Sequence, residues 1–189
     1  MGKLIVEQIV SADGYTEDAN GSIEFFEHER SINDADADQI RLLDDVGAIV
    51  LGRRTFELFE GFWAEMDPAQ EPVAEPINRI PKYVVSNSLD AAPWGRRGDS
   101  AQILRGDGAA SVQALKAKVD GDVIVWGSLT LVDSLLKADA VDVLRIRLIP
   151  KLIGAGRAIA PPDLGHRRMT LRDVRSYKDG FVVIEYGLG

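Results

Sequence analysis

The stretch Ala48-Ile-Val-Leu-Gly-Arg-Arg-Thr-Phe-Glu57 decides the fold class of this 189-residue chain. Its apolar run is bounded by Gly47 and Gly52 and is too short for a solvated helix, so it predicts a buried strand. Two arginines and a threonine follow directly, where a helix is expected to begin. Helix-start N–H groups, guanidinium groups and hydroxyls all bind phosphate. The stretch therefore predicts a strand, a tight turn and a helix that together hold an anion. Arginines that are merely solvated at an ordinary helix start are the alternative.

The alternation of a short apolar strand with a helix recurs along the chain. Strands are expected at 3–10, 48–51, 81–85, 101–104, 122–126 and 141–150, and helices at 25–45, 55–62, 109–119 and 129–137. Residues 63–78 contain three prolines and are expected to form a connection with at most one short helix. Residues 169–176 and 181–186 predict a hairpin across Lys178-Asp-Gly180. Parallel strands need helical crossovers, so we expect an α/β fold with largely parallel strands, forming a single domain over residues 1–189.

Composition excludes several classes of function. The net charge of −8 and the pI near 4.8 argue against binding to nucleic acid or to anionic membranes. The absence of cysteine excludes disulfides, thiolate metal sites and cysteine nucleophiles, and the two histidines have no metal-ligand spacing, so no metal is expected. The opening apolar run is too short for a signal peptide, and no stretch reaches membrane-spanning length. We therefore expect a cytoplasmic protein that acts on a small molecule.

Three of the expected strands end in small or polar residues. These ends are Gly52-Arg-Arg-Thr55, Ser86-Asn-Ser88 and Gly127-Ser-Leu-Thr130. In an open α/β sheet, ligands bind beyond the carboxyl ends of the strands, where small residues let a ligand approach the backbone. The three loops therefore predict one shared site for an extended ligand such as a nucleotide with several phosphates. Neither the dinucleotide fingerprint nor a Walker P-loop is present in the sequence.

Charged residues inside the expected elements lead to three further expectations. Glu7 and Gln8 interrupt the apolar first strand and are expected to line a cavity. Along 141–150, Arg145 and Arg147 share one side with valine and isoleucine, opposite a leucine-rich side. The alternate acids Asp34, Asp36 and Asp38 are expected to form a solvated first helical turn, favoured by the helix dipole, rather than a metal site.

Five motifs in the same order resemble the dihydrofolate reductase-like superfamily. They are Ser11-Ala-Asp-Gly14, Val50-Leu-Gly-Arg-Arg-Thr-Phe-Glu57, Pro81-Lys-Tyr-Val-Val-Ser86, Val125-Trp-Gly-Ser-Leu-Thr-Leu131 and Pro150-Lys-Leu-Ile-Gly-Ala-Gly-Arg157. Within that superfamily, the chain looks like a stand-alone protein similar to the C-terminal reductase domain of riboflavin biosynthesis. The resemblance implies a mixed, mostly parallel sheet flanked by helices, with a C-terminal antiparallel hairpin closing one edge.

The resemblance also implies NADPH lying across the strand ends, and it assigns residues to it. Gly52, Arg53, Arg54 and Thr55 would hold the cofactor's phosphates, including the 2′-phosphate; Ser86 and Asn87 would border the adenosine; Gly127, Ser128, Leu129 and Thr130 would hold the pyrophosphate. Asp13 and Gly14 would lie near the nicotinamide and the substrate. Because hydride transfer belongs to the cofactor, the protein's task would be to orient and shield it.

The implied activity is NADPH-dependent reduction of a small pterin-like or pyrimidine-like heterocycle, or of a carbonyl compound, by a homodimer. A nucleotide-binding protein of the same fold without reductase activity is the alternative. Dihydrofolate reductases carry an acidic residue on the first helix that meets the pterin, and Glu24, Glu27 and Glu29 lie in that neighbourhood. Trp126 stands where riboflavin-biosynthesis reductases commonly carry an acidic residue before the glycine of the fourth motif.

Overall fold

The computed structural model describes residues 2–27, 34–95 and 98–189. Its helices are α1 Glu24–Glu27, α2 Asp34–Asp44, α3 Arg53–Trp63, α4 Ala74–Arg79, α5 Gly108–Lys116 and α6 Leu129–Lys137. Its strands are β1 Leu4–Ser11, β2 Tyr15–Asp18, β3 Val46–Gly52, β4 Lys82–Val85, β5 Pro93–Trp94, β6 Asp99–Ser100, β7 Gln102–Leu104, β8 Asp122–Trp126, β9 Val143–Ile149, β10 Gly156–Ala158, β11 Met169–Ser176 and β12 Val182–Leu188.

Eight strands form one sheet in the order β11-β12-β9-β1-β8-β3-β4-β7. The strands from β9 to β7 are parallel, whereas β12 pairs antiparallel with β9 and β11 pairs antiparallel with β12. This arrangement confirms the mixed, mostly parallel sheet and the C-terminal hairpin. Two small antiparallel pairs, β2 with β10 and β5 with β6, lie outside the main sheet.

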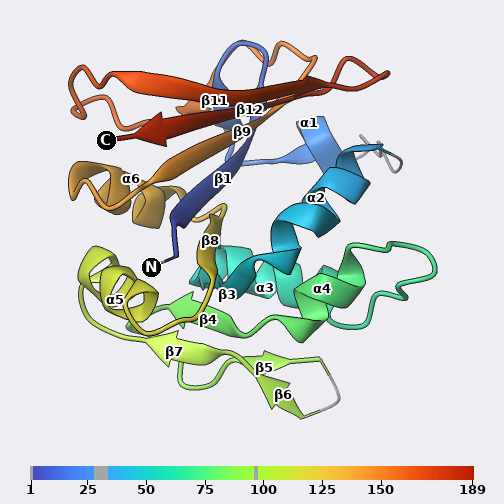
Figure 1. Cartoon of the computed structure of the whole chain (residues 1–189), viewed down its shortest axis with the longest axis vertical. Helices are drawn as coiled ribbons and strands as arrows, with labels where there is room; N and C mark the ends of the chain where they lie inside the picture. The colour runs from blue at the N-terminus through green and yellow to red at the C-terminus, as the bar shows by residue number, and fades with distance from the viewer. Residues whose placement is uncertain (1, 28–33, 96–97) are drawn as a thin grey trace.

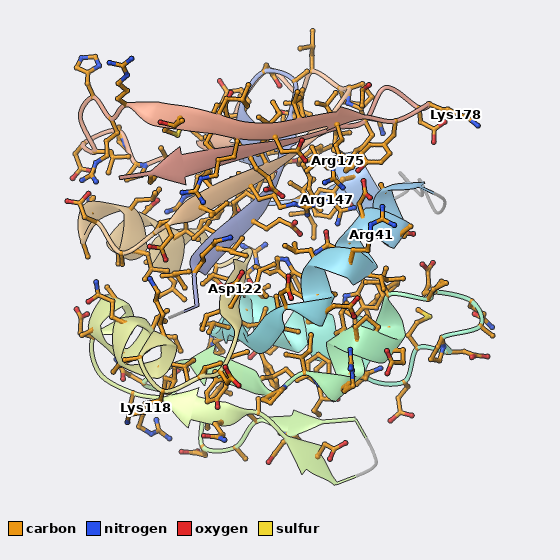
Figure 2. The ribbon with its side chains drawn as sticks, viewed as in Figure 1. Arg41, Lys118, Asp122, Arg147, Arg175 and Lys178 are labelled. Atoms are coloured by element: carbon orange, nitrogen blue, oxygen red, sulfur yellow. The ribbon has the colours of Figure 1, made fainter. Side chains whose placement is uncertain are left out.

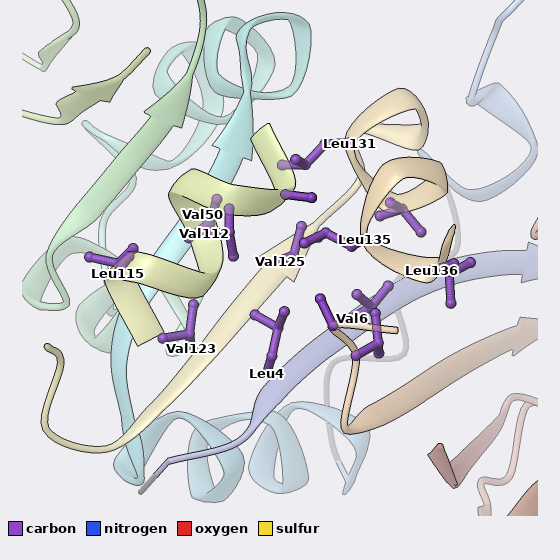
Figure 3. Packing of buried hydrophobic residues seen from close by; sticks show 14 of the residues in the cluster. Leu4, Val6, Val50, Val112, Leu115, Val123, Val125, Leu131, Leu135 and Leu136 are labelled. Atoms are coloured by element: carbon purple, nitrogen blue, oxygen red, sulfur yellow. The ribbon is translucent and has the colours of Figure 1, made fainter. Parts of the chain in front are cut away.

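Helices cover both faces of the parallel part of the sheet, so the molecule has two main cores (Figure 1). On one face, Leu4, Val6 and Val125 pack against α5 and α6 (Figure 3). On the other face, Ile5, Leu51 and the other side chains of that face pack against α2, α3 and α4. The alternation of neighbouring residues between the two cores follows from the period of two in a strand. It explains why the parallel strands are apolar on both sides.

Some expected elements differ in the structure. The helix expected at 25–45 corresponds to α1 and α2, and residues 28–33 between them lie outside the described part of the chain. Asp38 was expected to be solvated, and this is wrong: its side chain is buried. It accepts hydrogen bonds from Tyr177, which precedes β12, and from Arg41, and it forms an ion pair with Arg175 of β11 at 2.9 Å. The sequence pattern failed because the partners come from the far end of the chain.

The helix α2 runs opposite to the strand beneath it. Its first turn contributes Ala35 to a cluster with Ile149 at the end of β9. Its middle contacts Glu7 through Gln39, and Leu43 in its last turn packs in the core that holds Ile5. The N-terminal turn of α2 therefore lies at the same edge of the sheet as the carboxyl ends of β1 and β9.

Candidate functional site

Two helix starts meet at the carboxyl edge of the sheet, where α3 follows β3 and α6 follows β8. The backbone N–H of Gly52 donates a hydrogen bond to the Ser128 hydroxyl. The N–H of Ser128 in turn donates to Oγ1 of Thr55 at 2.9 Å, and the two hydroxyl oxygens are 3.1 Å apart. The structure therefore joins the first and third of the predicted ligand loops into one unit.

The close approach of these loops depends on glycine. A Cβ on Gly52 would lie 2.8 Å from Oγ of Ser128, and one on Gly127 would lie 2.8 Å from Oγ1 of Thr55. Gly127 also has a φ of +57°, in the left-handed region that other residues adopt at a cost. Ser128 adopts the left-handed conformation too, with a φ of +55°. This junction is thus a constrained feature of the fold rather than an ordinary pair of turns.

The two helix starts lack side-chain caps. Neither α3 nor α6 has a side-chain hydrogen bond at its N-cap, and neither carries an acidic residue in its first turn. By contrast, α5 is capped by Asp107, whose carboxylate accepts from the N–H of Ala110 at 2.8 Å. Uncapped first-turn N–H groups need an acceptor, and the helix dipole favours a negative one. The phosphates of a nucleotide satisfy both requirements.

Arg53 and Arg54 stand at this opening with their guanidinium groups largely in solvent. Their side chains are 57% and 69% exposed. Arg53 lies 3.7 Å from Glu57, one turn along α3. Arg54 reaches across to the loop after β2, donating to the Gly21 carbonyl at 2.6 Å and lying 3.5 Å from Glu17. Surface ion pairs of this kind are weak, so an incoming phosphate can compete for both arginines.

Ser86 and Asn87 follow β4, whose end lies next to that of β3. Their side chains bind their own loops: the Ser86 hydroxyl accepts from Leu89 N–H at 3.1 Å, and Asn87 Oδ1 accepts from Gly106 N–H at 2.7 Å. The structure therefore places these two residues at the predicted edge of the sheet. Their hydrogen bonds hold the neighbouring turns rather than the junction of α3 and α6.

Asp13 connects the end of β1 to the loop after β9 through hydrogen bonds. Its carboxylate accepts from the Ser11 hydroxyl at 2.7 Å, from Gly154 N–H at 2.7 Å and from Ile153 N–H at 3.2 Å. The hydrogen bond from Ser11 holds the pKa of Asp13 below its usual value. Burial raises this pKa, whereas the backbone bonds from Gly154 and Ile153 lower it further. Gly14 beside it has a φ of +92° and accepts from Ile159 N–H. The first and fifth motifs are thus in contact.

A buried polar network lies under this edge, between β1, β8, β9 and α2. The Glu7 carboxylate accepts from Trp126 Nε1 at 2.9 Å, from Gln39 Nε2 at 3.1 Å and from Arg145. Arg145 also donates to Gln39 at 2.6 Å and to Glu185 at 3.0 Å. Burial lowers the pKa of Arg145, but the two carboxylates raise it by more, so the group stays charged.

The sequence drew attention to Glu7 and to Trp126, but it did not indicate that the two side chains contact each other. Trp126 stands where an acidic residue was expected, and the carboxylate beside it comes instead from the neighbouring strand. A polar residue inside an apolar strand was the only signal in the sequence. Glu7 and Gln8 were expected to line a cavity. In the structure both side chains are buried and hydrogen-bonded: Glu7 belongs to the network, and Gln8 Nε2 donates to the Gly127 carbonyl at 2.8 Å.

Among the described residues, no group of three or more histidine, aspartate or glutamate side chains is arranged to hold a metal ion. The described helices are all shorter or more polar than a membrane span requires.

Asp36, on the first turn of α2, is half-buried. Burial raises the pKa of its carboxyl, while the charge of Arg147 opposes that rise.

Solved structures show the same fold. A putative riboflavin biosynthesis protein from Shewanella sp. PV-4 is 21% identical, with a TM-score of 0.79 and 99% of each chain covered. Dihydrofolate reductase from Enterococcus faecalis, complexed with NADP(H), is 13% identical, with a TM-score of 0.61 over 100% of this chain and 97% of that one. At these identities, the likeness concerns the fold.

Sequence comparison defines the family. The chain is 24% identical over 191 residues to the uncharacterized protein YyaP of Bacillus subtilis (strain 168), covering 97% of this chain and 94% of that protein. Residues 2–184 match the RibD C-terminal domain, which is nearly the whole chain. Together with the motif order and the shared fold, this match shows that the chain belongs to the RibD C-terminal domain family.

Proposed function

We propose that this protein is an NADPH-dependent reductase of a small pterin-like or pyrimidine-like heterocycle, or of a carbonyl compound, acting in the cytoplasm. The observation that carries the proposal is the junction of the two uncapped helix starts at Gly52, Thr55, Gly127 and Ser128. Two neighbouring sets of free N–H groups suit a ligand with more than one phosphate. The NADP(H) in the complex of the similarly folded Enterococcus enzyme supports the choice of nucleotide.

Each of the predicted ligand loops has a proposed role in holding the cofactor. The first turn of α3, with Arg53, Arg54 and Thr55, would hold the 2′-phosphate, and the first turn of α6, with Ser128, Leu129 and Thr130, would hold the pyrophosphate. Ser86 and Asn87 would border the adenosine. Asp13 and Gly14 would shape the nicotinamide end, since Asp13 fixes the loop that follows β9. When bound, NADPH would supply the hydride.

Thermal unfolding with and without nucleotide tests this proposal. A ligand at 100 times its Kd stabilises the native state by about 2.7 kcal/mol, which corresponds to a rise in Tm of roughly 5–10 °C for a chain of this size. We expect this rise with NADPH and a much smaller one with NADH. The double variant Arg53→Ala/Arg54→Ala should lose the NADPH effect, whereas Arg79→Ala, an exposed arginine on α4, should keep it. Equal or absent shifts for NADPH and NADH would refute the proposal.

A nucleotide-binding protein without reductase chemistry is the second candidate. The observation that favours it is Trp126, which fills the place of an acidic residue and directs its indole N–H into the buried network. The two candidates are separated by NADPH oxidation followed at 340 nm with pterins and pyrimidines. Cofactor binding without oxidation of NADPH by any of these compounds would favour the second candidate.

We also propose that the protein is a homodimer. The outer strand β11 exposes three apolar side chains, Met169, Leu171 and Val174, of which the last two are 56% and 55% exposed. Their partners on β12 are Leu188, Tyr186 and Ile184, so all three lie on one face of the sheet. Contiguous exposed apolar surface of this kind is typical of an association surface.

A further inference from the structure

Arg145 and Arg147 lie on the same face of β9, and their bonding differs. Arg145 is fully engaged by Glu7, Gln39 and Glu185. Within the described part of the chain, the carboxylate beside Arg147 is more distant, since Nη1 of Arg147 is 3.9 Å from Oε1 of Glu7. Its Nε is the one buried side-chain nitrogen or oxygen without a hydrogen-bond partner in the described part of the chain. Buried guanidinium N–H groups are normally satisfied, so this orphaned donor points to an absent acceptor.

The register of the sheet places Arg147 toward the ligand-binding edge. Arg145 pairs with Glu7, while Arg147 pairs with Ile9, two residues closer to the carboxyl end of β1. Because α2 runs the opposite way, Asp36 lies one turn closer to that edge than Gln39, which contacts Arg145. Figure 2 shows Arg147 on the sheet beside α2. The opposing influence of Arg147 on the pKa of Asp36 agrees with this proximity.

Aromatic side chains surround this pair. The Arg147 guanidinium lies 5.2 Å from the centre of the Phe181 ring. Phe25 and Phe26 pack on the same cluster as Phe181 and contact each other edge to face at 5.1 Å. Apolar aromatic walls with a few oriented polar groups are typical of small-molecule sites.

We propose that Arg147 determines which heterocycle this chain accepts, by donating hydrogen bonds to an oxo group on the ring while Asp36 accepts from an adjacent ring N–H. The inference rests on the proposed function, because it assigns the substrate end of the same site. A guanidinium has donors and no acceptor, so it pairs with an oxo group and opposes an amino group at the same ring position. Arg147 is therefore a specificity residue that selects oxo-substituted over amino-substituted rings.

Fluorescence titration with two ring probes tests this assignment. Lumazine carries an oxo group at C2, where pterin carries an amino group, and it also has a hydrogen on the neighbouring N1; both compounds carry an oxo group at C4. The comparison therefore tests recognition of an oxo group at C2 together with a ring N–H beside it. In the presence of NADP+, we expect the wild-type protein to bind lumazine at least tenfold more tightly than pterin. The variant Arg147→Gln should lose about tenfold in lumazine affinity and most of the preference, with an unchanged Tm shift from NADP+. Arg175→Gln, which alters a nearby arginine bound to Asp38, should keep the wild-type preference.

Other results would overturn the assignment. These are equal or tighter binding of pterin by the wild type, binding of neither probe, or an unchanged lumazine preference in Arg147→Gln. If Arg147→Gln does not fold, as shown by its circular dichroism, Asp36→Asn serves instead and should weaken lumazine binding to a similar degree. Binding of NADPH alone, measured on the wild type, separates this inference from the proposed function: failure of NADPH to bind refutes the reductase, whereas a wild-type protein that binds NADPH but does not prefer lumazine refutes only the role of Arg147.

Discussion

Glu7 is the residue on which the buried network depends. One carboxylate satisfies an indole N–H, an amide and a guanidinium, all from elements distant in sequence. A buried charge with one partner removed is far more costly than a buried pair, because the remaining charge stays desolvated. The pair Glu7 and Arg145 therefore fixes how β1, β9 and α2 come together under the site.

We expect Glu7→Gln to destabilise the fold strongly. The amide keeps the shape but removes the charge facing Arg145, and it turns an N–H group toward donors that need an acceptor. Breaking such a buried pair costs about 3 kcal/mol or more, measurable by urea unfolding. Glu57→Gln is the matched control, since Glu57 lies in an exposed pair with Arg53 and its loss should change stability by less than about 0.5 kcal/mol. A loss of similar size in both variants would contradict the assigned role of Glu7.

At the level of single residues, sequence and structure agreed on which side chains share a face. The alternation along 141–150 correctly placed Arg145 and Arg147 together, because strand geometry alone determines it. The alternation alone does not indicate which of the two arginines has all its N–H groups bonded. That difference depends on Glu7, Gln39 and Glu185, which reach β9 from three other elements.

At the level of elements, the junction of α3 with α6 is the feature on which the proposed nucleotide site rests. The sequence predicted its parts, since glycine at a strand end followed by a helix is a local signal. The contact between Ser128 and Gly52 was expected only in the general sense that the loops share an edge. The pair β2 and β10 was missed, because its two short strands lie far apart in sequence and carry no turn signal that joins them.

The glycine at the start of α6 provides a test at this scale. In Gly127→Ala, the new Cβ would press on Thr55 at 2.8 Å and would occupy a left-handed conformation that costs about 1–2 kcal/mol. We expect a lower Tm and a loss of the stabilisation by NADPH, both measured by thermal unfolding. Gly61→Ala is the control, because Gly61 lies within α3 with nothing within 4 Å of a new Cβ. Alanine there should stabilise the helix by about 0.5–1 kcal/mol and leave the NADPH effect intact.

If Gly127→Ala retained the full NADPH-induced rise in Tm, the junction would not be the phosphate site. A loss of the rise in Gly61→Ala as well would point to a general effect on α3 rather than to the junction.

At the level of the whole molecule, the sheet has two different halves. From β9 to β7 it is parallel and covered on both faces, whereas the hairpin of β11 and β12 extends beyond the helices (Figure 1). The order of the parallel strands was not predictable from the alternation of elements, since many orders satisfy the same pattern. The resemblance to a known superfamily indicated only the mixed sheet and the hairpin that closes one edge, not the order of the strands.

The exposed apolar face of β11 predicts how copies of the chain associate. We expect Leu171→Lys to convert the dimer to a monomer in size-exclusion chromatography with light scattering, because a charge on this face opposes its burial. Leu171 is exposed, so the substitution should leave the Tm of the monomer nearly unchanged. Leu152→Lys changes an equally apolar residue that is 78% exposed on a loop, and it should remain dimeric. A monomeric wild type, or a dimeric Leu171→Lys, would refute this surface.

The order of the strands has a consequence for synthesis of the chain. β1 is synthesised well before both of its neighbours in the sheet, β8 and β9, which begin only at Asp122 and Val143. β8 lies between β1 and β3 in the sheet, so these two earliest strands of the main sheet do not pair with each other. Pairing across such long separations is slow, because a large loop must close before any contact forms. β3 can pair early with its other neighbour β4, which begins at Lys82, whereas β1 has no partner strand in the main sheet until β8 is made. The central strand β8 must then insert between β1 and the β3–β4 pair late.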